Sequence, residues 1–175
     1  IEESCNYYFY EMGYRMGTSD TGTFKNTTGI KIIQKYAEMF GLNTTSGIEL
    51  PESDPHISDS DAIRSAIGQG NHNYTATQIA RYVTSVANEG TVYNLSLVSE
   101  IKDNEGNSVY KDEHTVYNQI DIPASDWKTI KQGMRQVVTV HTDKDALINT
   151  INVEVAGKTG TAQEDKTRPN HALII

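Results

Sequence analysis

Segments with helical periodicity alternate along this chain with turn-bounded strand pairs, and this alternation constrains the fold more than any other feature. Apolar residues at helical spacing predict four helices, over residues 7–16, about 30–40, 75–90, and from about 126 onward. The turn DNEG predicts a hairpin of two strands within 92–111, and HALII completes a second hairpin after the loop EDKTRPN. Because helices and hairpins mix without regular strand–helix–strand units, the sequence predicts an α+β fold with an antiparallel sheet packed against helices.

Several of the predicted elements carry start and stop signals. Gly41 is a good stop for the second helix, and Thr75 with Gln78 occupies the positions of a capping box at the start of the third. Ser125 is expected to cap the fourth helix. The inward face of that helix is predicted to carry Trp127, Ile130, Met134, Val137 and Val138.

Composition excludes several classes of function. The 175 residues suffice for one domain or part of one, and the net charge of -8 argues against nucleic acid as a partner, because the long-range field repels it. No run approaches eighteen apolar residues, so the chain as given is expected to be soluble, with any membrane anchor upstream. The single Cys5 and the absence of close histidine spacings predict no metal site and no cofactor.

The stretch AGKTGTAQED holds the first candidate site. The alternation of Val153 and Val155 with polar residues predicts a strand, with Lys158, Thr159, Gly160 and Thr161 extended along its end. Gly160 would let a ligand backbone approach, and the hydroxyls of Thr159 and Thr161 would face one side. An extended peptide could therefore lie along this strand, its carboxylate held by hydroxyls and an ammonium group; an ordinary polar edge strand is the alternative.

The second candidate site is Ser4-Cys5-Asn6. Positions i and i+2 diverge on a helix, so Ser4 and Asn6 serve one cleft only if they lie on a loop before the first helix. Capping of that helix is the alternative role, because serine and asparagine are favoured caps.

Taken together, these motifs and their spacers carry a family resemblance. With Ser4-x-Asn6, Lys158-Thr159-Gly160 and the intervening stretches GLNTTSGIELPES, AIGQGNHNYTATQIARYVTSVANEGTVY and QGMRQVV, the chain resembles the transpeptidase domain of class B penicillin-binding proteins, of the penicillin-binding protein 2 type. The resemblance implies the fold shared with serine β-lactamases. It also implies peptidoglycan cross-linking by serine acyl transfer, with β-lactams as inhibitors.

The resemblance implies a role for each matching residue. Ser4 would relay a proton, and Asn6 would position the substrate amide. Lys158 would support the relay electrostatically. Thr159 and Thr161 would bind the terminal carboxylate of the stem peptide along Gly160, and the Thr161 N–H would contribute to the oxyanion hole.

One part of the family pattern is missing. The family places its nucleophile in an S-x-x-K motif upstream of S-x-N, so residues 1–175 are expected to be a partial domain, truncated at both ends and inactive alone. Three S-x-x-K matches begin at Ser99, Ser108 and Ser125, but all lie in the wrong order. The first two fall in the predicted hairpin, where positions i and i+3 face opposite sides.

Three alternatives stay open. A β-lactam-sensing receptor shares the fold, but usually has an apolar residue where Asn6 stands. A class A serine β-lactamase would need a deacylating glutamate, for which Glu49 and Glu52 are candidates. A structural domain without activity is the third.

The resemblance further implies stem peptide and β-lactams as ligands, a glycan polymerase and morphogenesis proteins as partners, and a membrane-anchored, extracytoplasmic parent protein.

Overall fold

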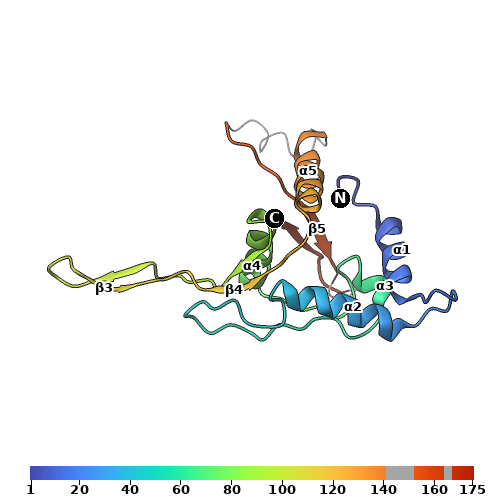
Figure 1. Ribbon diagram of the computed structural model, residues 1–175, viewed down its shortest axis with the longest axis horizontal. Helices are drawn as coiled ribbons and strands as arrows, with labels where there is room; N and C mark the ends of the chain where they lie inside the picture. Colours follow the sequence, from blue (N-terminus) through green and yellow to red (C-terminus); the bar gives the residue numbers. More distant parts are fainter. Residues whose placement is uncertain (141–151, 164–166) are drawn as a thin grey trace. The chain divides into compact units, whose positions relative to one another are not determined.

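The computed structural model describes residues 1–140, 152–163 and 167–175 (Figure 1). The chain divides into two compact units. The first unit comprises Ile1–Ile33, Ser58–Asn71 and Ile122–Ile175, and the second comprises Gln34–Ile57 and His72–Asp121. The helices are α1 (Asn6–Gly17), α2 (Asn26–Met39), α3 (Ala62–Ser65), α4 (Ala76–Ala87) and α5 (Ala124–Val140). The strands are β1 (Thr91–Tyr93), β2 (Glu100–Lys102), β3 (Ser108–Lys111), β4 (Val116–Gln119), β5 (Thr159–Ala162) and β6 (His171–Ile174).

Small residues bring the helices of the first unit into contact. A Cβ atom at Gly13 of α1 would lie 2.8 Å from the carbonyl oxygen of Ala62, and one at Gly29 of α2 would lie 2.7 Å from the Ala62 Cβ. Ala62, in α3, is fully buried. Its N–H donates to the side-chain oxygen of Asn26 at 2.7 Å. These contacts fix α1, whose first residue is the predicted site residue Asn6.

Helix α5 holds the segment that leads into β5. Arg135 donates through Nη1 to the carbonyl of Val155 at 2.7 Å, and the Gly157 N–H donates to the carbonyl of Met134 at 3.1 Å. A Cβ at Gly157 would lie 2.7 Å from the carbonyl oxygen of Ile175, so only glycine fits beside the end of β6. Lys158 therefore begins its strand from a fixed point.

The second unit is organised around α4. Thr75 and Gln78 form the predicted capping box, with both reciprocal hydrogen bonds present. The buried Arg81 donates to the carbonyls of Gly41, Thr44 and Thr45, which follow the end of α2. Strand β1 pairs with β4, and β2 pairs with β3 around the DNEG turn.

The predicted fold class is confirmed, since within the described residues helices accompany three two-stranded sheets, each of them antiparallel. Trp127, Val137 and Val138 are buried on α5 as predicted, with Ile130 and Met134 half-buried. Four details were wrong. Helix α2 begins at Asn26 instead of about 30, and Ser125 lies inside α5 instead of capping it. Val153 and Val155 precede the strand, which begins at Thr159. The stretch 92–111 holds parts of three strands instead of two, because β1 pairs with β4 outside the DNEG hairpin.

Of the loop expected at 164–170, residues 164–166 lie outside the described residues. Across the described residues, no helix combines the length and the apolar character needed to cross a membrane.

Candidate functional site

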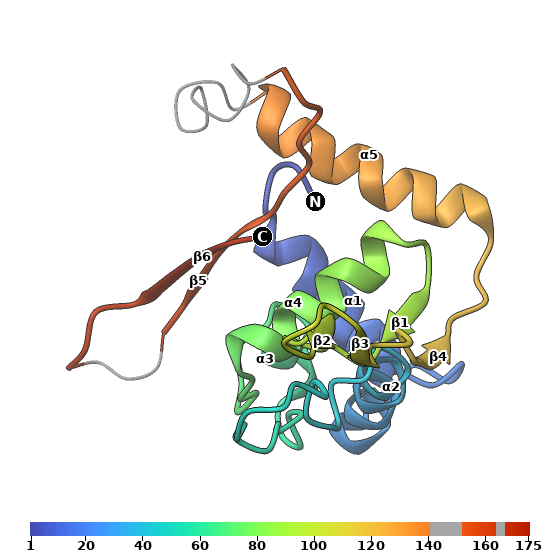
Figure 2. The ribbon, with the colours of Figure 1, turned by 90° about the vertical axis from the view of Figure 1, so that its left-hand side faces the viewer.

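The two candidate motifs meet in the first unit. The ammonium group of Lys158 donates a hydrogen bond to the hydroxyl oxygen of Ser4, although the two residues are 154 positions apart. The same ammonium group donates to the carbonyl of Thr159 at 2.8 Å. The side chain of Lys158 therefore links the loop before α1 to the segment that enters β5. Figure 2 shows the N-terminal segment and the β5–β6 hairpin.

Ser4 does not cap α1. The N-cap position is held by Cys5, whose side chain makes no capping hydrogen bond, and Ser4 stands one residue earlier with a φ of 48°. A non-glycine residue at positive φ is uncommon and raises the energy of the backbone. Ser4 thus lies on a loop before the helix, as its predicted role requires, and its hydroxyl points to Lys158.

Asn6 is the first residue of α1, and its side chain is exposed. It follows Ser4 by two positions on the same exposed segment. The structure therefore places all three of Ser4, Asn6 and Lys158 in the first unit, with Ser4 and Lys158 in direct contact.

The hydrogen-bond register of β5 determines which of its backbone groups are available. Lys158 and Ile175 exchange both backbone hydrogen bonds, at 2.7 and 3.1 Å, and Gly160 lies opposite Leu173 two positions later. In an antiparallel pair, bonded and non-bonded positions alternate. The N–H and C=O groups of Thr159 and Thr161 therefore point away from β6, toward the edge that no other described strand occupies.

The side chains of β5 leave that edge open. Thr159 and Thr161 lie two positions apart, so their hydroxyls share one face, and both residues are exposed. A Cβ at Gly160 would meet only the Leu173 Cβ, at 4.0 Å. The strand thus offers two hydroxyls, an ammonium group and the backbone N–H groups of Thr159 and Thr161 to an extended ligand.

Partial burial lowers the pKa of Lys158 below its ordinary value, because leaving water disfavours the charged form. A lysine with a lowered pKa gives up its proton more readily than an ordinary lysine does.

Gln69 is a neighbour of this strand that the sequence did not reveal. Its side-chain amide donates to the carbonyl of Thr161 at 3.4 Å. The GQG triplet around it reads as an ordinary turn, and only the fold brings it to β5. The spacing of 92 residues between the two partners left no local signal.

The glutamates considered for a β-lactamase are engaged elsewhere. Glu49 accepts from the hydroxyl of Ser96 and the N–H of Leu97, and these bonds lower its pKa to about 2. Burial by itself would raise the pKa of Glu52, but hydrogen bonds from Thr75, Thr77 and Ser46 outweigh it and lower the pKa to about 2. A carboxylate with such a pKa is a poor base for activating water near pH 7.

The three S-x-x-K matches differ in their placement. Ser99 precedes β2, and Ser108 lies in β3, where residues three apart face opposite sides. Ser125 shares a helical face with Lys128, but its hydroxyl lies 3.3 Å from the carboxylate of Asp126. Among the residues that the structure describes, no group of three histidine, cysteine or acidic side chains could hold a metal ion.

The chain matches a known protein family over almost its whole length. Residues 1–173 match the penicillin binding protein transpeptidase domain. The chain belongs to this family. The predicted resemblance to class B penicillin-binding proteins is thereby confirmed.

Individual relatives agree with this family. Penicillin-binding protein H of Bacillus subtilis (strain 168) is 32% identical over 142 aligned positions, covering 75% of this chain and 20% of that protein. Peptidoglycan D,D-transpeptidase MrdA of Haemophilus influenzae is 30% identical over 191 aligned positions, covering 97% of this chain and 27% of that protein. The solved penicillin-binding protein 2B of Streptococcus pneumoniae (strain R6) superposes with a TM-score of 0.76 at 27% identity, covering 99% of this chain and 31% of that one. This transpeptidase-family chain therefore spans only about a quarter of such proteins, and the roles of its site residues stay predictions.

Proposed function

We propose that this chain supplies the S-x-N and K-T-G parts of a peptidoglycan D,D-transpeptidase site that works by serine acyl transfer and binds β-lactams. The contact between Lys158 and Ser4 beside the open edge of β5 is the observation that carries the proposal. Two groups that can transfer a proton, Lys158 and Ser4, thus lie next to β5, a strand that can bind a peptide ending in a carboxylate.

The reaction begins with a nucleophilic serine outside residues 1–175, as the family pattern implies. Its oxygen bonds to the carbonyl carbon of the penultimate D-alanine, and the serine proton passes by way of the Ser4 hydroxyl to the amine of the terminal D-alanine. The C–N bond then breaks, and the terminal D-alanine leaves. An amine of a second stem peptide attacks the resulting ester, which forms the cross-link and returns the proton to the serine.

The residues of β5 bind and orient the substrate. The hydroxyls of Thr159 and Thr161 donate hydrogen bonds to the carboxylate of the terminal D-alanine, and the Lys158 ammonium group adds a positive charge. The N–H of Thr161, on the open edge, stabilises the negative charge that develops on the carbonyl oxygen. Asn6, in the S-x-N motif, donates a hydrogen bond from its side-chain amide to the substrate peptide.

The same chemistry suggests the setting of the whole protein. Cross-linking consumes stem peptides carried on new glycan strands, so we place the parent protein beside a glycan polymerase and cell-wall morphogenesis proteins. This work requires an extracytoplasmic site at the bacterial membrane, to which the parent protein would be anchored.

Exchange chemistry tests the proposal. The full-length gene product is incubated with a pentapeptide that ends in D-Ala-D-Ala and with a labelled D-amino acid. We expect release of D-alanine, incorporation of the label, and inhibition of both by benzylpenicillin. Stable acylation by benzylpenicillin without exchange would indicate a β-lactam sensor instead, and rapid hydrolysis of benzylpenicillin would indicate a β-lactamase.

A further inference from the structure

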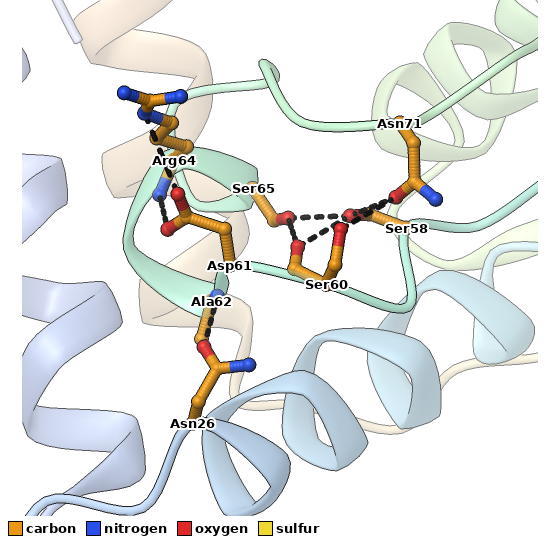
Figure 3. Close-up of polar contacts among 8 residues, drawn as sticks. All are labelled: Asn26, Ser58, Ser60, Asp61, Ala62, Arg64, Ser65 and Asn71. Atoms are coloured by element: carbon orange, nitrogen blue, oxygen red, sulfur yellow. Dashed lines mark hydrogen bonds and ion pairs between the residues drawn. The ribbon is translucent and has the colours of Figure 1, made fainter.

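The loop that carries Gln69 is held by a buried network of serine hydroxyls. Ser58 and Ser65 are buried, and the hydroxyl of Ser65 donates to that of Ser58 at 2.6 Å. Ser58 in turn donates to the side-chain oxygen of Asn71 at 2.7 Å (Figure 3). Buried hydroxyls that are satisfied in this way fix a loop in one conformation, because each unpaired group would cost free energy.

Two glycines and two backbone hydrogen bonds complete the loop. The N–H groups of Gly68 and Gln69 donate to the carbonyls of Ser65 and Arg64, at 3.0 and 3.1 Å. Gly68 and Gly70 have φ values of 80° and 93°, which glycine adopts easily. A Cβ at Gly70 would lie 2.8 Å from the Ser65 hydroxyl and 2.9 Å from that of Ser58, so the network packs directly against the loop.

The fixed loop delivers one hydrogen bond to the proposed catalytic strand. The Gln69 amide donates to the Thr161 carbonyl, which points to the same open edge of β5 as the Thr161 N–H. A carbonyl oxygen has two lone pairs, so a bond from Gln69 leaves one for an added peptide strand. In the described residues β5 pairs only with β6, so this bond is a restraint on the opposite edge of the strand.

We propose that Gln69 is a positioning residue for acyl transfer: its amide holds the Thr161 carbonyl in place and so restrains the backbone of this residue, whose N–H on the same strand edge keeps the orientation that the oxyanion needs. The inference rests on the proposed function. Gln69 acts through the strand, and a donor displaced by a fraction of an ångström loses much of its value in the transition state.

The test uses acylation of the full-length protein by benzylpenicillin, with the binding constant and the acylation rate constant measured separately. Gln69→Glu keeps the shape of the side chain and removes the donor. We expect the acylation rate constant to fall about tenfold while the dissociation constant of the initial complex changes by less than about twofold. Gln132→Glu, the same change at an exposed position on α5, should leave both unchanged.

A second pair of variants tests the network independently of the Gln69 side chain. Gly70→Ala places a methyl group against the serine hydroxyls, whereas a Cβ at Gly68 meets no atom within 4 Å. Both changes place alanine at a positive φ, so they strain the backbone to a similar extent. We therefore expect acylation to be slower in Gly70→Ala than in Gly68→Ala. This pair decides the question if Gln69→Glu lowers the melting temperature substantially.

The outcomes separate the two proposals. If the wild-type protein is acylated and Gln69→Glu reacts at the wild-type rate, Gln69 does not position the strand, and the proposed function stands. If Gln69→Glu weakens only the initial complex, Gln69 contacts the ligand and the positioning role is wrong. A wild-type protein that benzylpenicillin does not acylate would overturn the proposed function, and this inference with it.

Discussion

At the scale of single residues, Lys158 is the centre of the proposed site. Lys158→Ala removes both the donor to Ser4 and the positive charge beside the carboxylate subsite. We expect acylation of the full-length protein by benzylpenicillin to slow by about a hundredfold, comparable to the loss of a transition-state hydrogen-bond donor. Lys31→Ala, an exposed lysine on α2, is the matched control. Equal rates for the two variants would contradict the role of Lys158.

The titration of Lys158 predicts a pH profile. Burial lowers the pKa of Lys158, so its charged form is lost at a lower pH than that of an ordinary lysine. In a plot of the acylation rate against pH, the decrease on the alkaline side should therefore have its midpoint below the pH at which free lysine titrates. Arginine keeps its charge at all accessible pH values. The Lys158→Arg variant should therefore lack this alkaline decrease, even if its acylation is slower than that of the wild type. An alkaline decrease that is identical in the two proteins belongs to another group.

Glu52 stabilises the fold and takes no part in the proposed reaction. It accepts hydrogen bonds from Ser46, Thr75 and Thr77 in the second unit. Glu52→Gln should lower the free energy of unfolding by about 1–3 kcal/mol, toward the lower value because Glu52 is only half-buried. Glu38→Gln, an exposed change on α2, should cost little.

The lowered pKa of Glu52 makes its stabilising contribution depend on pH. Its folded-state pKa is lowered to about 2, so its contribution is present above the unfolded value of about 4.3 and is lost as the pH falls toward 2. Thermal unfolding of the full-length protein should therefore show the difference between wild type and Glu52→Gln shrinking across that window. A difference that grows on acidification would contradict it.

At the scale of elements, the open edge of β5 makes the sharpest prediction. Thr161→Pro removes an N–H that makes no bond to β6, so the hairpin can retain its register. We expect acylation to slow by at least about a hundredfold, because this N–H is the proposed oxyanion donor. Thr161→Val keeps the N–H and loses only the hydroxyl, so its acylation should slow less than that of Thr161→Pro. The two rates are compared with benzylpenicillin.

Local signals explain which elements the sequence could predict. The capping box at Thr75 and the turn DNEG act over a few residues, and both were found where predicted. The early start of α2 was missed because Gly29 disfavours a helix locally, whereas its contact with Ala62 requires a small residue there. Strand β4 was missed because its partner, β1, lies more than twenty residues earlier, so its pairing is not local.

At the scale of the whole molecule, the site depends on contacts that no spacing predicts. Ser4 and Lys158 are 154 positions apart, and it was the ordered match to a family, rather than periodicity, that suggested their proximity. Gln69 was missed for the same physical reason, since an amide in a glycine turn has no local signature of the strand it contacts. The sequence predicted the chemistry of the motifs, and tertiary contacts determined their neighbours.

The most direct test of the central claim is the location of the acyl group. The full-length gene product and residues 1–175 alone are treated with excess benzylpenicillin, and their intact masses and peptide maps are compared. We expect an adduct on the full-length protein only, at a serine outside residues 1–175. An adduct on Ser4, Ser99, Ser108 or Ser125 would contradict it, because the residues here assigned to proton relay or structure would then include the nucleophile.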